Sequence, residues 1–145
     1  MDNLSDWTLE DLPKPTLDLC KAKSDIERWG YCLLDKAVPE PLLSQCRNRL
    51  NEQAAAEKAA CIAFEDGGPA QQWGDFTDEF GKVRHEAFRE ENGGVNQRVW
   101  MLINKGSVFR DLLELESMNK IVRYILGDRF ILSSFTANIA RPGGV

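Results

Sequence analysis

Apolar residues recur at helical spacing in four stretches of the chain. In residues 18–29, Leu19 and Ile26 stand among charged residues, and Gly30 then ends the pattern. A longer amphipathic stretch begins at Pro39, where proline is tolerated in a first turn, and is typical of a scaffold helix that covers a sheet. The predicted helices are residues 18–29, residues 39–61, a helix capped by Ser107, and a helix capped by Ser117 and ended by Gly127.

Three further stretches have the composition or the alternation of strands. Residues 31–34 are a short apolar run, and residues 96–104 are rich in strand formers. The third stretch begins at Arg129 and ends where Arg141-Pro142-Gly143 breaks it. One of its faces turns polar towards the end, which fits a strand that enters a pocket and equally a solvated strand end. That face carries Phe130, Leu132, Ser134, Thr136 and Asn138.

Two segments lack a periodic pattern. Residues 1–15 are acidic and broken by prolines, so we expect an irregular N-terminal arm, followed by a single domain over residues 16–145. Residues 64–95 are rich in glycine and charge but carry several aromatic side chains. Such long segments are often lids or else disordered, and the aromatic residues favour a lid. His85 lies there among charged neighbours, which favours a solvated side chain over a metal ligand.

Composition narrows the class of protein. The 145 residues carry a net charge of -5, and the basic residues are dispersed among acids, so nucleic acid is not an expected partner. The sequence holds no apolar run of the roughly 20 residues that span a bilayer and begins with acidic residues, so we expect a cytoplasmic protein without a membrane partner. Four cysteines without a C-x-x-C pair are expected to be buried free thiols.

Several segments taken together carry a family resemblance. They are DIERWGYCLL, NQRVWMLINKGSVFRDLLE and ILGDRFILSSFTANIARPGG, with an R-V-x-x-L motif in the second. In this order they resemble the N-terminal half of the phytanoyl-CoA dioxygenase family, over residues 24–145. The resemblance implies an α+β fold: N-terminal helices and the first strands of a double-stranded β-helix of the jelly-roll or cupin type, with the barrel incomplete in this chain.

The same resemblance implies an oxygenase. Enzymes of that family oxidise an aliphatic C–H of a small organic substrate, with 2-oxoglutarate as co-substrate. They use Fe(II) that is held by an H-x-D pair and a distant histidine. None of these three ligands stands in this sequence, so they are expected beyond Val145 or in another chain that completes the barrel, and this chain alone is expected to be inactive. Arg98 matches an arginine that reaches the 2-oxoglutarate site in some members, and a guanidinium suits a carboxylate.

Other interpretations of these residues remain open. Arg98 could equally be a surface arginine at a strand end. Thr136 and Asn138 are candidates to face the co-substrate, but a shift of one residue in strand register would turn them to the opposite face. A different class of function also fits: a non-catalytic α+β interaction module, or a degenerate oxygenase relative that acts through a partner chain. The fold alone does not decide between them.

Overall fold

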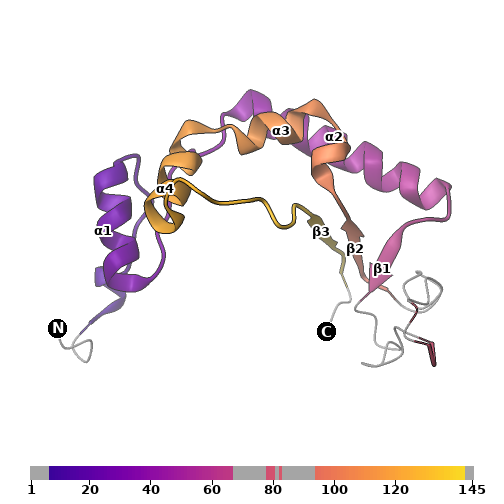
Figure 1. The fold of residues 1–145 in the computed structure, drawn as a ribbon, viewed down its shortest axis with the longest axis horizontal. Helices are drawn as coiled ribbons and strands as arrows, with labels where there is room; N and C mark the ends of the chain where they lie inside the picture. The colour runs from indigo at the N-terminus through magenta and orange to yellow at the C-terminus, as the bar shows by residue number, and fades with distance from the viewer. Residues whose placement is uncertain (1–6, 67–77, 81, 83–93, 143–145) are drawn as a thin grey trace. The chain divides into compact units, whose positions relative to one another are not determined.

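The computed structural model describes residues 7–66, 78–80, 82 and 94–142. The chain divides into two compact units, Met1–Leu42 with Asp111–Ile131, and Leu43–Arg110 with Leu132–Val145. Over the described residues the structure holds four α-helices and one three-stranded antiparallel sheet (Figure 1). This content confirms the α+β class predicted from the sequence.

In the first unit, α1 (Leu19–Trp29) begins and ends where the sequence predicts. The Asp18 side chain accepts a hydrogen bond from the N–H of Cys20 at 2.8 Å, which caps the first turn. Gly30 adopts φ 79° and donates its N–H to Ile26 O at 2.9 Å. A left-handed residue is favourable at this position because glycine has no Cβ to clash.

The second helix of this unit, α4 (Glu116–Leu126), ends at Gly127 as predicted but does not use Ser117 as its cap. Leu115 precedes the helix, and its side chain makes no capping bond. Instead the Asn119 side-chain amide donates to the carbonyls of Leu113 at 2.7 Å and Leu115 at 3.1 Å. The prediction of a Ser117 cap was therefore wrong by two residues, because a side chain further along the helix fixes the entering loop.

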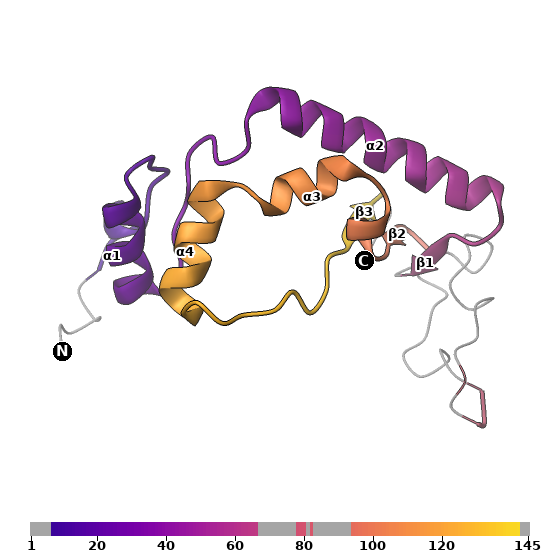
Figure 2. The same cartoon turned by 45° about the horizontal axis from the view of Figure 1, so that its top comes forward.

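Helices α1 and α4 lie side by side (Figures 1 and 2). Tyr124 of α4 donates its hydroxyl to the Glu27 carboxylate of α1, and Lys23 Nζ lies 4.8 Å from the centre of the Tyr124 ring. The predicted strand at residues 31–34 is reduced to one parallel bridge between Thr16 and Leu34. The Thr16 N–H donates to Leu33 O at 3.0 Å, and the Asp35 N–H donates to Thr16 O at 2.9 Å.

The second unit contains most of α2 (Glu40–Ala59), a helix that stops two residues before the predicted end at Cys61. Cys61 adopts φ 57°, and its N–H donates to Lys58 O at 2.9 Å. The N–H of Ile62 then reaches back to Glu57 O, also at 2.9 Å. These two bonds form a Schellman ending with cysteine at the left-handed position that glycine usually occupies.

The sheet of this unit has the strand order β1 (Phe64–Asp66), β2 (Asn96–Val99) and β3 (Ala137–Ala140). Both pairings are antiparallel. In the first cross-strand row Phe64 lies opposite Arg98, and Arg98 opposite Asn138; in the next, Glu65 lies opposite Gln97, and Gln97 opposite Ile139. Val99, Leu102 and Phe109 are the most buried apolar residues beside the sheet.

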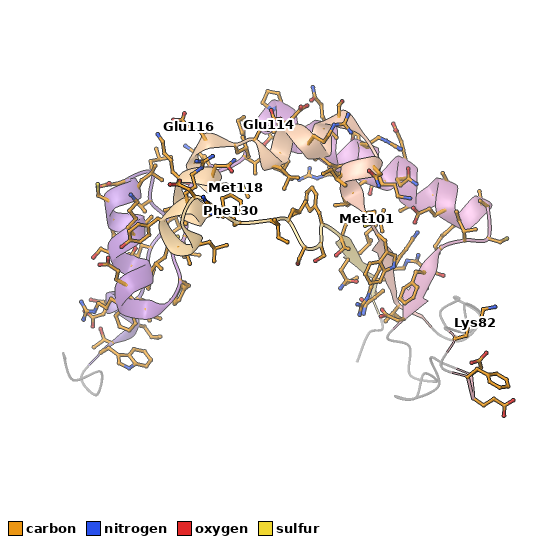
Figure 3. All side chains as sticks on the ribbon, in the orientation of Figure 1. Lys82, Met101, Glu114, Glu116, Met118 and Phe130 are labelled. Atoms are coloured by element: carbon orange, nitrogen blue, oxygen red, sulfur yellow. The ribbon has the colours of Figure 1, made fainter. Side chains whose placement is uncertain are left out.

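Two predicted strands are shorter than expected. The ladder of β2 stops at Val99, because Met101 (labelled in Figure 3) adopts φ 56° and ψ 51°. The chain then enters a 3₁₀ turn at Leu102–Asn104. Residues 129–136 form no ladder, so the strand predicted from Arg129 is confined to β3. The Phe135 carbonyl instead accepts one hydrogen bond from the Leu102 N–H at 2.9 Å, and this bond is not continued as a ladder.

The remaining sequence predictions are met in part. Cys46 is buried and Cys32 partly so, but Cys20 and Cys61 are exposed, so burial of all four thiols was wrong. Residues 7–15 of the predicted arm hold one 3₁₀ turn, Leu9–Asp11. The predicted lid at 64–95 begins with strand β1, and most of its other residues, His85 among them, lie outside the described residues.

Candidate functional site

The two faces of the sheet differ in what covers them. Side chains alternate along a strand, so neighbouring residues point to opposite faces. The helix face carries Glu65, Gln97 and Ile139, and it is covered by α2, because Gln97 Nε2 donates to Ala54 O at 2.9 Å. The far face, turned away from α2, carries Phe64, Asp66, Asn96, Arg98 and Asn138. Thr136 comes directly before β3, outside the ladder.

On the helix face, a buried carboxylate is fully paired. Glu65 is only 4% exposed, and its Oε1 lies 2.9 Å from Lys58 Nζ and 2.5 Å from Arg141 Nη2. Arg141 Nη2 also donates to Gln97 Oε1 at 3.2 Å. Because Arg141 follows β3 and Glu65 lies on β1, this ion pair ties the two outer strands together across β2. A buried charge is tolerated when its partners satisfy it in this way.

Gly94 packs against the backbone of the same strand. A Cβ at Gly94 would lie 2.9 Å from the carbonyl carbon of Glu65 and 3.1 Å from the backbone nitrogen of Asp66. The next residue, Val95, donates its N–H to Asp66 O at 2.9 Å. The end of β1 is therefore fixed through its backbone.

A second polar row runs along α2 and holds the turn after β2. Arg49 Nη2 donates to Gln53 Oε1 at 2.6 Å, and Gln53 Nε2 donates to Glu57 Oε1 at 2.9 Å. Lys105 Nζ then bonds Glu57 Oε1 at 2.9 Å, while its carbonyl accepts from Arg49 Nε at 2.7 Å. All four side chains have partners, so this row is a structural link between α2 and the turn.

The far face brings two of the three sequence-predicted site residues together. Arg98 and Asn138 are direct cross-strand partners, and Thr136 stands two residues before Asn138. Thr136 and Asn138 are exposed, and the Arg98 side chain is 43% exposed. Phe64 and Trp100 form an edge-to-face aromatic pair beside them, with ring centres 5.4 Å apart. The far face thus offers the Arg98 cation, the amide side chains of Asn96 and Asn138, and an aromatic pair.

Arg98 already has an ion-pair partner on the far face, the carboxylate of Asp66. Arg98 Nη2 is 2.7 Å from Asp66 Oδ2, and the Asp66 side chain is 13% exposed. The contact uses one oxygen only: Arg98 Nε and Asp66 Oδ1 are buried without a hydrogen-bond partner. A guanidinium and a carboxylate can form two parallel bonds, so this pair is half made. Sequence reasoning missed Asp66, since it had assigned that residue to an irregular loop.

The fit to the implied cofactors is uneven. A carboxylate of 2-oxoglutarate suits Arg98, which has Asn138 opposite it. Iron does not fit: in the described part of the chain, no three histidine, cysteine, aspartate or glutamate side chains are grouped so that they could hold a metal ion. No metal ligand is therefore assigned to these residues.

The clear pKa shifts fall outside the far face. Hydrogen bonds from Thr8 lower the pKa of Asp11, and the hydrogen bond from Lys120 lowers that of Glu116. The hydrogen bond to Glu27 raises the pKa of Tyr124. All three groups lie in the first unit, so these shifts belong to helix ends and to the contact between α1 and α4.

Comparisons with family models, with curated proteins and with solved structures find no match. Among the helices of the described ranges, none combines the length and the apolar character needed to cross a bilayer. The functional assignment therefore depends on the resemblance of the sequence and on the geometry of the far face.

Proposed function

We propose that this chain is the front part of an Fe(II)/2-oxoglutarate-dependent dioxygenase of the phytanoyl-CoA dioxygenase family, which oxidises an aliphatic C–H of a small organic substrate. The observation that carries the proposal is the cross-strand pairing of Arg98 with Asn138 on the far face. In a double-stranded β-helix, one face of each sheet lines the barrel and the other packs outside. The contacts of α2 with the helix face support an orientation in which the far face lines the barrel.

Within this proposal, the chain binds and orients the co-substrate. Arg98 pairs with a carboxylate of 2-oxoglutarate, because a guanidinium offers two donors in the geometry that a carboxylate accepts. Asn138 and Thr136 add hydrogen bonds beside it. The iron ligands come from residues outside 1–145, in the same polypeptide or in another chain, and no chemical step is assigned to the residues described here.

The decisive test is the protein that the whole gene encodes. We expect an H-x-D motif within a few residues after the segment that ends in Arg141-Pro142-Gly143. We also expect Fe(II)-dependent conversion of 2-oxoglutarate to succinate by the full-length protein, and a raised KM for 2-oxoglutarate in Arg98→Gln. A full-length protein without that motif would refute the proposal.

A second test uses residues 1–145 alone. We expect no stoichiometric Fe(II) binding in an anaerobic titration followed by calorimetry. Tight 1:1 binding would contradict the assignment of the iron ligands to other residues, and His85 with its acidic neighbours would then be the first candidates.

One observation favours the alternative of an interaction module. Apolar side chains are exposed at the end of α4 and beyond it, at Ile125, Leu126 and Ile131, of which Ile131 is 89% exposed. Exposed apolar side chains mark protein contacts, and they also mark a face that the rest of a domain would cover. The full-length sequence separates the two: an interaction module needs no H-x-D motif, and its exposed face would remain exposed in the complete protein.

A further inference from the structure

Asp66 has two opposite effects on the binding of a ligand by Arg98. Its carboxylate neutralises Arg98, and it competes with any ligand carboxylate that approaches the same guanidinium. The two residues lie on neighbouring strands, on the same face of the sheet and two cross-strand rows apart. A ligand that binds Arg98 therefore meets a resident anion 2.7 Å from Nη2.

The geometry of the Arg98–Asp66 ion pair is that of a contact that a ligand carboxylate can replace. It consists of one close N–O contact, while Arg98 Nε and Asp66 Oδ1 have no partners although both are buried. A buried polar atom without a hydrogen bond is unfavourable, so the pair does not satisfy either side chain fully. On the helix face, by contrast, Oε1 of Glu65 has two cationic partners. The two adjacent carboxylates thus differ in how completely they are held.

The backbone at Asp66 does not take part in such an exchange. Its carbonyl accepts from Val95 N–H, and Gly94 packs closely on the strand at this point. Asp66 and Arg98 can therefore separate by rotation of either side chain between staggered conformations, without a change in the strand backbone.

We infer that Asp66 is an internal counter-ion that occupies Arg98 in the ligand-free chain, and that a ligand carboxylate binds by displacing it. This inference rests on the proposed role of Arg98 as a carboxylate-binding residue. Asp66 then sets the affinity and the selectivity of the far face: a ligand must bring a carboxylate that pairs with the guanidinium better than the half-made internal contact. Neutral ligands, which cannot replace the charge of Asp66, are excluded.

The test is a titration of residues 1–145 with 2-oxoglutarate and with succinate, followed by NMR signals of the Arg98 Nε–H group and of the Asp66 carboxyl carbon. In the wild type both signals should move with the same midpoint, because one event changes both groups. In Asp66→Asn the dissociation constant should fall about fivefold, the change expected when one partly exposed ion pair no longer competes. Arg98→Gln should abolish binding.

The matched control is Glu116→Gln, which changes the net charge by the same amount. Glu116 pairs with Lys120 at 2.6 Å in the other compact unit and is 81% exposed, so its removal should leave the dissociation constant within about twofold. The wild-type titration does not depend on whether Asp66→Asn folds.

The outcomes separate this inference from the proposed function. Binding through Arg98 that leaves the Asp66 signal unchanged, or equal affinities in the wild type, Asp66→Asn and Glu116→Gln, would overturn the counter-ion role and leave Arg98 as a carboxylate-binding residue. Absence of binding in the wild type and in a folded Asp66→Asn variant would overturn both roles. Activity of the full-length protein tests the dioxygenase assignment separately.

Discussion

The buried carboxylate of Glu65 offers a direct test of what holds the three-stranded sheet together. Its Oε1 accepts from Lys58 Nζ at 2.9 Å and from Arg141 Nη2 at 2.5 Å, and the side chain is 4% exposed. Glu65→Gln keeps the shape and the accepting oxygen but removes the charge. Each charge-assisted bond then becomes an ordinary one, a difference of about 1 to 1.5 kcal/mol per bond.

The sum of the two bonds overstates the effect, because the two cations can regain part of their hydration. Lys58 and Arg141 are 32% and 28% exposed. We therefore expect Glu65→Gln to lower the free energy of opening of the sheet by about 2 kcal/mol. At about 1.4 kcal/mol per factor of ten, the amide protons of β2 should exchange with solvent about thirtyfold faster.

Hydrogen exchange followed by NMR measures this change strand by strand, so opening of the first unit does not obscure it. The control is Glu52→Gln on α2, in the same unit, where the carboxylate is 70% exposed and 3.6 Å from Arg49. It should alter exchange in β2 by less than about threefold. If Glu65→Gln changes exchange no more than this control does, the ion pairs of Glu65 do not stabilise the sheet.

Three further changes test other parts of the structure. Gly94→Ala should destabilise the sheet by about 1–3 kcal/mol in urea unfolding, because the added Cβ would lie 2.9 Å from backbone. Cys61→Gly should stabilise α2 by about 0.5–1 kcal/mol, because Cys61 is exposed and adopts the left-handed conformation, φ 57°, that glycine adopts without strain. A thermal melt shows whether the melting temperature rises. The pKa of Tyr124 is raised above 10.0 by its hydrogen bond to Glu27, so this contribution to stability is present below pH 10 and lost as pH rises through the folded-state pKa. Ultraviolet titration in a Tyr31→Phe background measures that pKa, and Glu27→Gln should move it towards 10.0.

The helices were predictable because their signals are local. Asp18 and Gly30 lie within one turn of the ends of α1, and Gly127 ends α4 as expected. Errors of two residues occurred where an unusual local group set one end of a helix. The Asn119 amide fixes the start of α4, and Cys61 takes the left-handed position after α2. Neither feature has a sequence pattern that marks it.

The sheet was less predictable because its pairing is long-range. β1 consists of Phe64-Glu65-Asp66. Its two acidic residues are typical of a loop, and only the pairing with β2 makes the segment a strand. Conversely, residues 129–136 alternate as a strand does but find no neighbour to form a ladder. The grouping of Arg98 with Asn138 follows from the register, which no local pattern specifies. Asp66 could be identified as a partner of Arg98 only from that register.

The two adjacent carboxylates of β1, Glu65 and Asp66, test stability and ligand binding separately. Glu65 and Asp66 point to opposite faces because side chains alternate. Glu65 is almost wholly buried and has two cations, so removing its charge should change stability and leave the far face intact. Asp66 has one partly exposed partner in a half-made contact, so removing its charge should change ligand affinity more than stability. If both substitutions instead changed only stability, the far face would be a second structural face, and Arg98 would have no ligand to bind.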